Sequence, residues 1–426
     1  MTVTSVLKQQ FSENLHDALL TEIYIDTGCI ARQRDRYQDA ISHYVECFGE
    51  QAVEIYSAPG RSEIGGNHTD HQHGQVIAGS INLDAVAIVG RTGDDVIRIK
   101  SDGYDLISVD ITACDPVDSE RETTLSLIKG VVAGFRQRGY RTGGFQAYIT
   151  SDVLIGAGLS SSAAFEVLIG TILSGLYNEM KISPIEIAII SQYAENVYFG
   201  KPCGLMDQMA CSVGSLVHID FADPEKPAVE RIAFDVEKAG YSLCITDTKG
   251  SHADLTADYA AVPGEMKAVA AFFGKEVLIE IKESEFIEKI PALRQKLGDR
   301  AVLRALHFYE ENKRVVKEAD ALKQSDFEGF LKNVKASGAS SFQYLQNVYT
   351  NRDITSQNMS IALALSEVAL GANGVCRVHG GGFAGTIQAF VRNESVASYR
   401  QAMDAVFGED SCKVLKIRKY GGMKVL

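Results

Sequence analysis

Positive charge is scarce in this sequence. Lys and Arg together number 42 against 55 Asp and Glu, so the formal net charge is −13 and the pI is near 5.3. An acidic surface favours solubility and disfavours binding to nucleic acid or to anionic membranes. A phosphate site in such a chain must therefore be local, built from backbone N–H groups, a metal ion and a few cationic side chains.

Three other features are missing. None of the eight cysteines falls in a CxxC spacing, which disfavours a zinc site or a disulfide framework and indicates free thiols in a reducing compartment. The first 20 residues lack the basic and apolar segments of a secretory signal. No window approaches 18 uninterrupted apolar residues. We therefore expect a cytoplasmic protein with no membrane or nucleic-acid partner.

The residues that are present indicate an α+β protein of two domains. Residues 1–49 have helical apolar spacing, whereas residues 53–109 form short β-branched runs separated by turns. Later strands and helices interleave without regular βαβ alternation, which disfavours a doubly wound sheet. The acidic, proline-bearing stretch 221–230 is the best candidate boundary. The predicted units are a helical extension (1–30), an N-terminal domain (31–225) and a C-terminal domain (226–426).

The first of three glycine-bearing segments is GAGLSSSA, from Gly156 to Ala163, before an apolar helix expected over 163–177. Small residues let backbone N–H groups approach an anion, and the first turn of a helix favours negative charge. The serine hydroxyls add donors to phosphate or ligands for Mg²⁺. The segment is not a Walker A loop, because the lysine of that motif is absent. A flexible turn with a serine N-cap is the alternative.

The second segment contains Arg61 in APGR and the polar run from Asn67 to His73. An arginine offers a fixed fork of donors to an oxyanion, and the polar run suits a polyhydroxylated ligand. A metal cluster at the histidines and a solvated loop are the alternatives, although the histidine spacing matches no metal motif such as HExxH. The third segment, His379 to Gly385, carries a triple glycine that lets backbone pack closely against a phosphate or another loop.

Together these segments resemble the signature motifs of the GHMP small-molecule kinases, and within them the galactokinase family. The resemblance rests on SAPGRSEIGGNHTDHQHG, VLIGAGLSSSAAFEV, AENVYFGKPCGLMDQMACSVG, ITDTKGSHADLTADY and CRVHGGGFAGT, and extends from about Arg32 to the C-terminus. It implies an N-terminal ribosomal-protein-S5-like domain and a C-terminal ferredoxin-like domain, with the active site between them. The activity it implies is transfer of the γ-phosphate of ATP, with Mg²⁺, to the anomeric hydroxyl of galactose.

The resemblance also assigns roles to individual residues. Asp207 would be the catalytic aspartate and Arg61 would balance charge on the phosphoryl group, while Ser162 and Glu195 would bind Mg²⁺. By pattern alone, Asp207 reads as a helix cap and Glu195 as part of a solvated helix face. Implied sugar contacts are Asn67, His68, Thr69, Asp70 and Tyr259. Implied ATP contacts are Ser101, Gly156, Ala157, Gly158, Leu159, Ser160, Ser161 and Ser162.

The sequence departs from the family pattern where sugar specificity is concerned. Asn67 stands where the family has Glu, and Glu63 stands where it has Asn. An amide bonds a hydroxyl without charge, so Glu63 is a candidate to supply the missing carboxylate. A kinase of another sugar, such as an N-acetylhexosamine or a uronic acid, is one alternative. A non-catalytic sensor of sugar and ATP is another, although a sensor need not keep Arg61, Ser162, Glu195 and Asp207.

Overall fold

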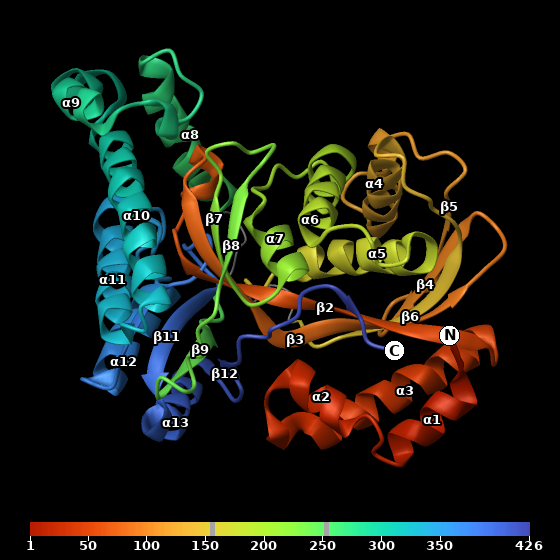
Figure 1. Ribbon diagram of the computed structural model, residues 1–426. Helices are drawn as coiled ribbons and strands as arrows, with labels where there is room; N and C mark the ends of the chain where they lie inside the picture. The colour runs from red at the N-terminus through yellow and green to blue at the C-terminus, as the bar shows by residue number, and fades with distance from the viewer. Residues whose placement is uncertain (154–157, 251–254) are drawn as a thin grey trace.

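The computed structural model describes residues 1–153, 158–250 and 255–426, and it contains two β-sheets with helices packed on them (Figure 1). The larger sheet has nine strands, of which six follow the order β1-β2-β3-β6-β4-β5; β13 pairs with β2, β7 with β3, and β8 with β7. Its strands are β1 (Thr2–Val3), β2 (Ala52–Gly65), β3 (Gln75–Arg91), β4 (Val96–Ser101), β5 (Ile107–Asp110), β6 (Phe145–Ser151), β7 (Leu216–Asp220), β8 (Ala228–Ile232) and β13 (Met423–Lys424).

Both faces of this sheet are covered, as the alternation of side chains along its long strands requires. Ile55 and Val86 belong to a core shared with the N-terminal helices, whereas Tyr56 and Ala87 belong to the core on the opposite face. Figure 1 shows the two groups of helices on either side of β2 and β3. They are α1 (Thr4–Ser12), α2 (Asp17–Tyr24) and α3 (Ile30–Phe48) below, and α4 (Thr124–Gln137), α5 (Ser161–Asn178), α6 (Pro184–Tyr193) and α7 (Met206–Val213) above.

The smaller sheet is antiparallel, with the order β10-β11-β9-β12. Its elements follow one another along the chain in a β-α-β-β-α-β order, which is the ferredoxin-like arrangement. The strands are β9 (Tyr241–Asp247), β10 (Gly374–Val378), β11 (Thr386–Arg392) and β12 (Cys412–Leu415). The helices of this half are α8 (Thr256–Phe272), α9 (Glu283–Leu297), α10 (Asp299–Lys323), α11 (Phe327–Ser340), α12 (Asn358–Leu370) and α13 (Val396–Phe407).

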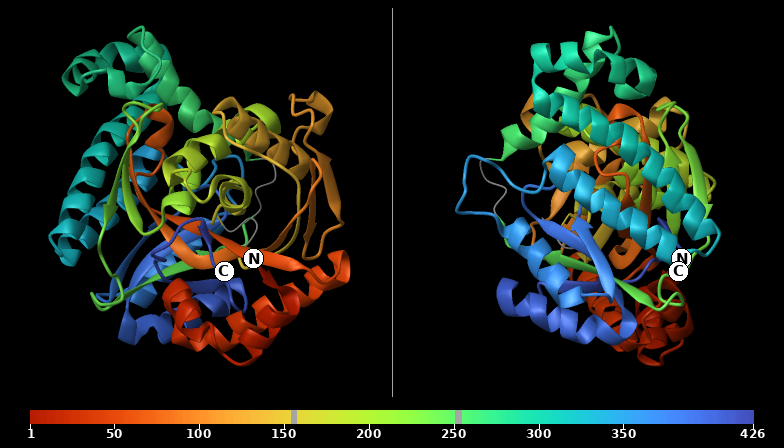
Figure 2. Two further views of the ribbon diagram at one scale, coloured as in Figure 1. Left: turned by 45° about the vertical axis from the view of Figure 1, so that its right-hand side comes forward. Right: turned by 90° about the vertical axis from the view of Figure 1, so that its left-hand side faces the viewer.

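The α+β class is as predicted, and two connections pass between the expected domains. β8 extends the larger sheet to Ile232, beyond the predicted limit at residue 225. The last residues of the chain return to the same sheet, where Ile417 bridges Ile81 and β13 pairs with β2. Because β1 and β13 both pair with β2, the two termini lie side by side (Figure 2).

The hairpin of β2 and β3 positions most of the functional segments. Its register shifts between Pro59 and Arg61 and again between Glu63 and Gly65. Proline has no N–H for the sheet ladder, and glycine at position 60 lets another chain segment approach, since a Cβ there would lie 2.8 Å from the Leu159 carbonyl oxygen. These bulges bring Arg61 against the glycine-serine segment, whose Leu159 carbonyl accepts the Arg61 N–H at 3.1 Å.

Local sequence explains the elements beside this hairpin. α6 begins at Pro184 with the Ser183 hydroxyl accepting the Glu186 N–H at 3.2 Å, a normal helix start. The helix continues past Tyr193 as a π-helical turn, η4 (Ala194–Phe199). No helix in the described ranges has the length and apolar content needed to cross a bilayer.

Candidate functional site

Arg61 and Asp207, 146 positions apart in sequence, form a bidentate pair between β2 and the first turn of α7. The Arg61 Nε and Nη2 atoms donate to Asp207 Oδ1 and Oδ2, each at 2.7 Å. The third guanidinium nitrogen, Nη1, donates to the Gly158 carbonyl. Arg61 is buried, whereas 32% of the Asp207 side chain is exposed. The carboxylate is thus held rigidly with one side open.

Ser160 joins this pair from the start of α5. Its backbone is left-handed, with φ of +58°, and its hydroxyl donates to Asp207 Oδ2. A carboxylate oxygen has about two acceptor positions. Within the described residues Oδ2 accepts from both Arg61 and Ser160, whereas Oδ1 accepts from Arg61 alone. Asp207 Oδ1 therefore has an acceptor position left for a ligand hydroxyl.

The charges of the pair stabilise each other. Burial opposes ionisation of Asp207, but the Arg61 charge and the hydrogen bonds from Arg61 and Ser160 outweigh it, and the pKa of Asp207 is lowered. Burial likewise opposes the charge on Arg61, and the Asp207 carboxylate raises the pKa of Arg61 despite it. Asp207 is therefore ionised at neutral pH and remains able to accept a hydrogen bond.

The third glycine segment reaches the same place. His379, fully buried, lies beside β2, with Nε2 3.1 Å from the Ser62 hydroxyl. A Cβ on Gly158 would lie 3.4 Å from His379 Nδ1 and 3.1 Å from Thr386 Oγ1. The three segments singled out in the sequence therefore meet around Arg61. Gly156 and Ala157 lie outside the described residues.

Glu195 lies on η4 in a second group of acidic and amide side chains. Its Oε1 accepts from Lys201 Nζ at 3.1 Å and its Oε2 from Gln208 Nε2 at 2.7 Å. The same Gln208 nitrogen reaches Glu166 Oε2 at 3.3 Å, and Glu166 is one turn after Ser162 on α5. Burial and the nearby Glu195 raise the pKa of Glu166 well above its usual range.

Two buried oxygens in this group have no hydrogen-bond partner within the described residues: Glu166 Oε1 and Gln208 Oε1. Unpartnered buried acceptors are costly unless a ligand or ion satisfies them. Together with the Glu195 carboxylate they are oxygen donors of the kind that a hard cation such as Mg²⁺ prefers, and Ser162 lies one turn before Glu166 on α5. The residues present thus fit the predicted metal.

The predicted sugar contacts separate into two groups, and Asn67 and Thr69 point into the protein. Asn67 is fully buried, its Nδ2 donating to Gly380 O at 2.7 Å and to Glu63 Oε1 at 3.1 Å. Its Oδ1 accepts from Asn347 Nδ2 at 2.9 Å and Ser341 Oγ at 3.2 Å. The Thr69 hydroxyl bonds carbonyls within its own loop, and the residue is fully buried. These side chains shape the loop.

Glu63, the candidate replacement for the missing carboxylate, is also buried. Its Oε1 accepts from Asn67 and from Arg377 Nη2, the latter at 2.8 Å. The departure from the family pattern is therefore an exchange within one contacting pair, with the acid at position 63 and the amide at position 67. The carboxylate is neutralised by Arg377 instead of being directed at a ligand.

His68 and Asp70 form the second group and are only partly buried. The Asp70 carboxylate lies against the backbone at Gly204, where a Cβ would be 2.0 Å from Asp70 Oδ2, so position 204 requires glycine. Burial and then the Asp207 charge raise the pKa of Asp70 to about 6. His68 donates from Nε2 to Gly381 O at 3.0 Å, and its Nδ1 lies 3.2 Å from His71 Nε2. Burial lowers the pKa of both histidines, so both are neutral.

Tyr259 and Ser101 belong to different parts of the fold. The Tyr259 hydroxyl, at the start of α8, donates to Gly382 O at 2.7 Å, and burial raises its pKa to about 12. It contacts the third glycine segment, as His68 and Asn67 do. Ser101 ends β4, which runs parallel to β6 and pairs with it at Ile149. It is therefore at the sheet edge from which the glycine-serine segment leaves, and its nucleotide contact stays a prediction.

Several site residues were not identified from the sequence. Glu166 lies inside a quoted motif, four residues after Ser162, and this spacing indicates that the two side chains are neighbours on one face of a helix. Gln208 follows Asp207 directly and Lys201 lies within the same quoted motif, but only tertiary contacts connect them to Glu195. His379 was seen as part of a glycine segment and not as a residue packed on β2.

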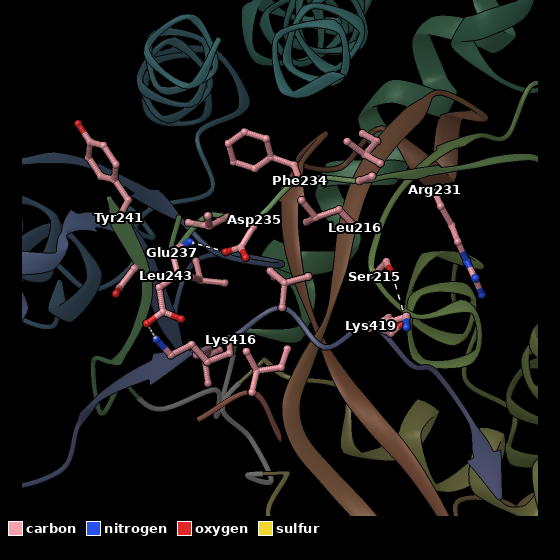
Figure 3. Close-up of a pocket in the computed structure, with 17 residues that line it drawn as sticks. Ser215, Leu216, Arg231, Phe234, Asp235, Glu237, Tyr241, Leu243, Lys416 and Lys419 are labelled. Atoms are coloured by element: carbon pink, nitrogen blue, oxygen red, sulfur yellow. Dashed lines mark hydrogen bonds and ion pairs between the residues drawn. The ribbon is translucent and has the colours of Figure 1, made fainter. Parts of the chain in front are cut away.

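A separate cavity of about 440 Å³ lies between β7 and β8 on one side and β9 and β12 on the other (Figure 3). Leu216, Phe234 and Leu243 line it, and Lys416 forms an ion pair with Glu237 at its edge. None of the predicted site residues in the described chain lines this cavity. The site is instead the surface where α5, α7 and the hairpin meet.

Comparison with known proteins agrees with this geometry. Residues 126–215 match the GHMP kinases N terminal domain, and residues 42–91 match the galactokinase galactose-binding signature. Galactokinases of Glaesserella parasuis and Actinobacillus pleuropneumoniae are each 31% identical, over 84% and 85% of this chain and 91% and 92% of theirs.

Solved structures show the same fold. A Lactococcus lactis galactokinase complexed with galactose superposes with a TM-score of 0.76 at 24% identity, covering 90% of this chain and 98% of its own. A mevalonate kinase gives a TM-score of 0.60 at 15% identity, covering 86% and 99%. The predicted two-domain GHMP architecture is thereby confirmed.

Proposed function

Because the chain belongs to the galactokinase family of the GHMP kinases, we propose that it transfers the γ-phosphate of ATP to the anomeric hydroxyl of galactose, giving galactose 1-phosphate and ADP. The observation that carries this proposal is the Arg61–Asp207 pair, which lies beside the glycine-serine segment and keeps one carboxylate oxygen open to a ligand hydroxyl. Phosphoryl transfer needs in-line positioning and charge balance more than covalent chemistry, and both are available here.

Asp207 orients the attacking hydroxyl and accepts its proton. Its Oδ1 is the available acceptor, so the anomeric O–H donates there while Arg61 and Ser160 fix the plane of the carboxylate. The lowered pKa keeps Asp207 ionised before the hydroxyl binds. Arg61 balances the charge that gathers as the phosphoryl group moves, because its guanidinium is buried directly behind the carboxylate.

The ATP phosphates bind at the start of α5. Among the described residues, no side chain caps the first N–H groups of this 18-residue helix, so they are available to an anion. Ser161 and Ser162, both partly exposed, add hydroxyl donors at the same end. The −13 net charge of the chain makes such a local site necessary.

Mg²⁺ fits the neighbouring oxygen cluster. Glu195 and Ser162 would hold it, with Glu166 and Gln208 beside them. When bound, the ion neutralises phosphate charge and orients the phosphate chain. In the protein itself, Gln208 holds Glu166 and Glu195 together through one amide nitrogen.

His68 and Asp70 are the side chains of the hairpin loop that we assign to the sugar. Asp70 lies near Asp207, whose charge is one cause of its raised pKa, and it is held against Gly204 at the approach to α7. A carboxylate in that place accepts from sugar hydroxyls next to the reacting one. The shape of this loop is held by three other side chains. Asn67 and Tyr259 donate to carbonyls of the third glycine segment, and Thr69 donates to a carbonyl beside its own loop.

The proposal is tested with a panel of sugars in a coupled ADP-release assay. The panel contains galactose, glucose, N-acetylgalactosamine and galacturonic acid, each with ATP and Mg²⁺. We expect turnover of galactose, and the product should be the 1-phosphate by ³¹P NMR. Robust turnover of another sugar with none of galactose would retain the kinase chemistry and refute the galactose assignment. Binding without turnover of any sugar would support a sensor.

A further inference from the structure

Helix α10, which belongs to the second half of the chain, packs on the end of the β2–β3 hairpin (Figure 1). The loop at that end, residues 67–75, is the loop that carries His68 and Asp70. Three residues of α10 bond to its main chain: His307, Glu311 and Asn312. None of them belongs to a motif quoted from the sequence, and together they contact both ends of the loop.

At the first end of the loop, the backbone C=O and N–H of Asn67 are both hydrogen-bonded to α10. His307 Nε2 lies 2.9 Å from the Asn67 carbonyl oxygen, which can only accept, so Nε2 carries the proton. His307 Nδ1 then accepts from the Ser340 hydroxyl at 2.9 Å. Glu311, one helical turn later, accepts the Asn67 N–H at 3.3 Å. The tautomer and orientation of His307 are therefore fixed by its partners.

Glu311 is itself held in place. It is fully buried, and its second oxygen accepts from Arg314 Nε at 2.7 Å while Ser337 donates to the first. The Asn67 side chain adds four further bonds to Glu63, Ser341, Asn347 and Gly380. This end of the loop is thus attached to β2, to the α10–α11 pair and to the third glycine segment at once.

The second end is bonded to α10 through one more accessible residue, and on its other side to β7, where the Gly74 carbonyl accepts the Phe221 N–H at 3.1 Å. Asn312 Oδ1 accepts the Gln75 N–H at 2.7 Å. Gly74 lies so close to α10 that a Cβ there would be 2.9 Å from both Asn312 Oδ1 and the Phe308 ring. Within the loop, Thr69 Oγ1 bonds the Gln75 carbonyl at 2.6 Å. Asn312 is only partly buried, so it can be changed without opening a core cavity.

We propose that α10 is the positioning element of the sugar loop: His307 and Glu311 fix residue 67, Asn312 fixes residue 75, and the segment between them presents His68 and Asp70 to the substrate. This inference rests on the proposed galactokinase function, because it takes galactose as the ligand of that loop. His307, Glu311 and Asn312 are positioning residues that touch the loop backbone. The coupling also makes the galactose affinity depend on a helix of the other half of the chain.

The test compares Asn312→Ala with Asn312→Asp. Alanine leaves the Gln75 N–H without an acceptor, whereas aspartate keeps an oxygen in the same position. For Asn312→Ala we expect the KM for galactose to rise about tenfold, as the loss of one such hydrogen bond predicts. The KM for ATP and kcat should stay within about twofold. Asn312→Asp should restore most of the galactose affinity.

Asn333→Ala is the matched control. Asn333 is also partly buried, lies on the neighbouring helix α11, and bonds only the Gly329 carbonyl of its own helix within the described chain. It should leave both KM values unchanged. A second pair, His307→Gln against His307→Leu, tests the other end: glutamine retains a donor for the Asn67 carbonyl, so it should be milder than leucine. Equal effects of the pair would count against the assigned bond.

Hydrogen exchange measured by mass spectrometry separates this inference from the proposed function. In Asn312→Ala, the peptide containing Gln75 should lose protection whatever sugar the enzyme uses. Loss of protection with an unchanged KM for galactose would overturn the inference, because the bond from Asn312 to residue 75 would then have no effect on sugar binding. Unchanged protection and unchanged KM would overturn it as well. Absence of galactose turnover by the wild type, with the expected loss of protection, would instead refute the proposed function.

Discussion

Two arginine–aspartate clusters lie near the same bulge of the β2–β3 hairpin. Asp207 pairs with Arg61 of β2, and Asp84 of β3, opposite Pro59 in the sheet, pairs with Arg36 and Arg418. The chemistry of the two ion pairs is the same, but their exposure differs. Asp207 retains 32% of its side-chain exposure, whereas Asp84 and Arg418 have none.

In the Asp84 cluster, donors within the protein occupy both carboxylate oxygens, whereas in the Asp207 cluster one oxygen keeps an open acceptor position. Asp84 accepts from Arg36 and Arg418, each at 2.8 Å, from the Tyr24 hydroxyl at 3.0 Å and from Ser57. Burial opposes its charge, but the two arginines lower the pKa of Asp84 nonetheless. The cluster thus fastens α2, α3 and the C-terminal segment to the sheet. An open acceptor makes the first cluster suitable for chemistry, and the absence of one makes the second a structural tie.

Asp207→Asn should have the largest effect of the changes proposed for this comparison. The amide keeps the size of the side chain but cannot take a proton, so kcat should fall by about 10³-fold or more. Because the buried Arg61 loses its carboxylate partner, thermal stability should fall as well, but by less than in a variant that leaves two buried arginines unpaired. Steady-state kinetics and a melting curve measure the two quantities, and calorimetry should still detect ATP binding. A variant with kcat within tenfold of wild type would remove Asp207 from the proposed mechanism.

Asp84→Asn should give the opposite result. The change leaves two buried arginines without their shared carboxylate, which costs about 3–5 kcal/mol in the free energy of unfolding. The kcat of the folded fraction should stay close to wild type. Urea denaturation measures the loss, with Asp94→Asn as the control, because Asp94 pairs with Arg98 at an exposed position where solvent screens the ion pair. A stable but inactive Asp84→Asn protein would contradict the comparison.

Glu195→Gln tests a buried carboxylate that we assign to binding. Its only charged partner within the described residues is Lys201, and the amide retains one oxygen ligand. We expect the Mg²⁺ concentration for half-maximal activity to rise by about tenfold, in the range typical for changes around a metal site. Activity against Mg²⁺ at fixed ATP measures it. A loss of melting temperature with an unaltered Mg²⁺ curve would place Glu195 with Asp84 as a structural group.

The smallest expected effect concerns Asp70, a carboxylate whose pKa is raised instead of lowered. Since its pKa is about 6, Asp70 takes up a proton as the pH falls through 6 and loses its charge toward the sugar. The ionised fraction of Asp70 falls about fourfold between pH 7.5 and 5.5, so the kcat/KM for galactose should fall by up to about fourfold over that interval. Asp207, whose pKa is lowered below 3.8, does not titrate in that interval.

The control for this pH dependence is Asp70→Asn, measured over the same pH range. The variant should bind galactose more weakly at every pH and should lack the inflection near pH 6. An inflection that persists in Asp70→Asn would assign the titration to another group. Asp70 would then no longer be an example of a carboxylate that has no arginine partner and titrates near neutral pH.

Much of the fold could be predicted because it is encoded locally. The apolar run after the glycine-serine segment predicts a helix over 163–177, and α5 covers Ser161–Asn178. Arg61, Asp207 and the three glycine segments were identified from motifs, and the structure brings them together. Periodicity and motif spacing depend on residues a few positions apart, so they need no knowledge of the tertiary contacts.

The inward orientation of Asn67 could not be predicted in this way. The motif gave it the place of a sugar-binding glutamate, whereas its partners Ser341 and Asn347 are more than 270 positions away in sequence. The same is true of Glu311, which bonds the Asn67 N–H from α10. A pattern gives the type of residue at a position, and the partner of a polar side chain depends on which distant element packs beside it.

By itself, the sequence determined an α+β kinase of the GHMP type, and it predicted the phosphate loop and named Arg61 and Asp207 as the pair proposed for the reaction. Only the tertiary structure decided which carboxylates stay open to a ligand and which are used within the protein. Asp84 and Asp207 are both aspartates paired with arginines, and neither composition nor spacing distinguishes them. The difference arises because the C-terminal segment and α3 cover one side of the hairpin completely, while the start of α7 leaves the other side partly exposed.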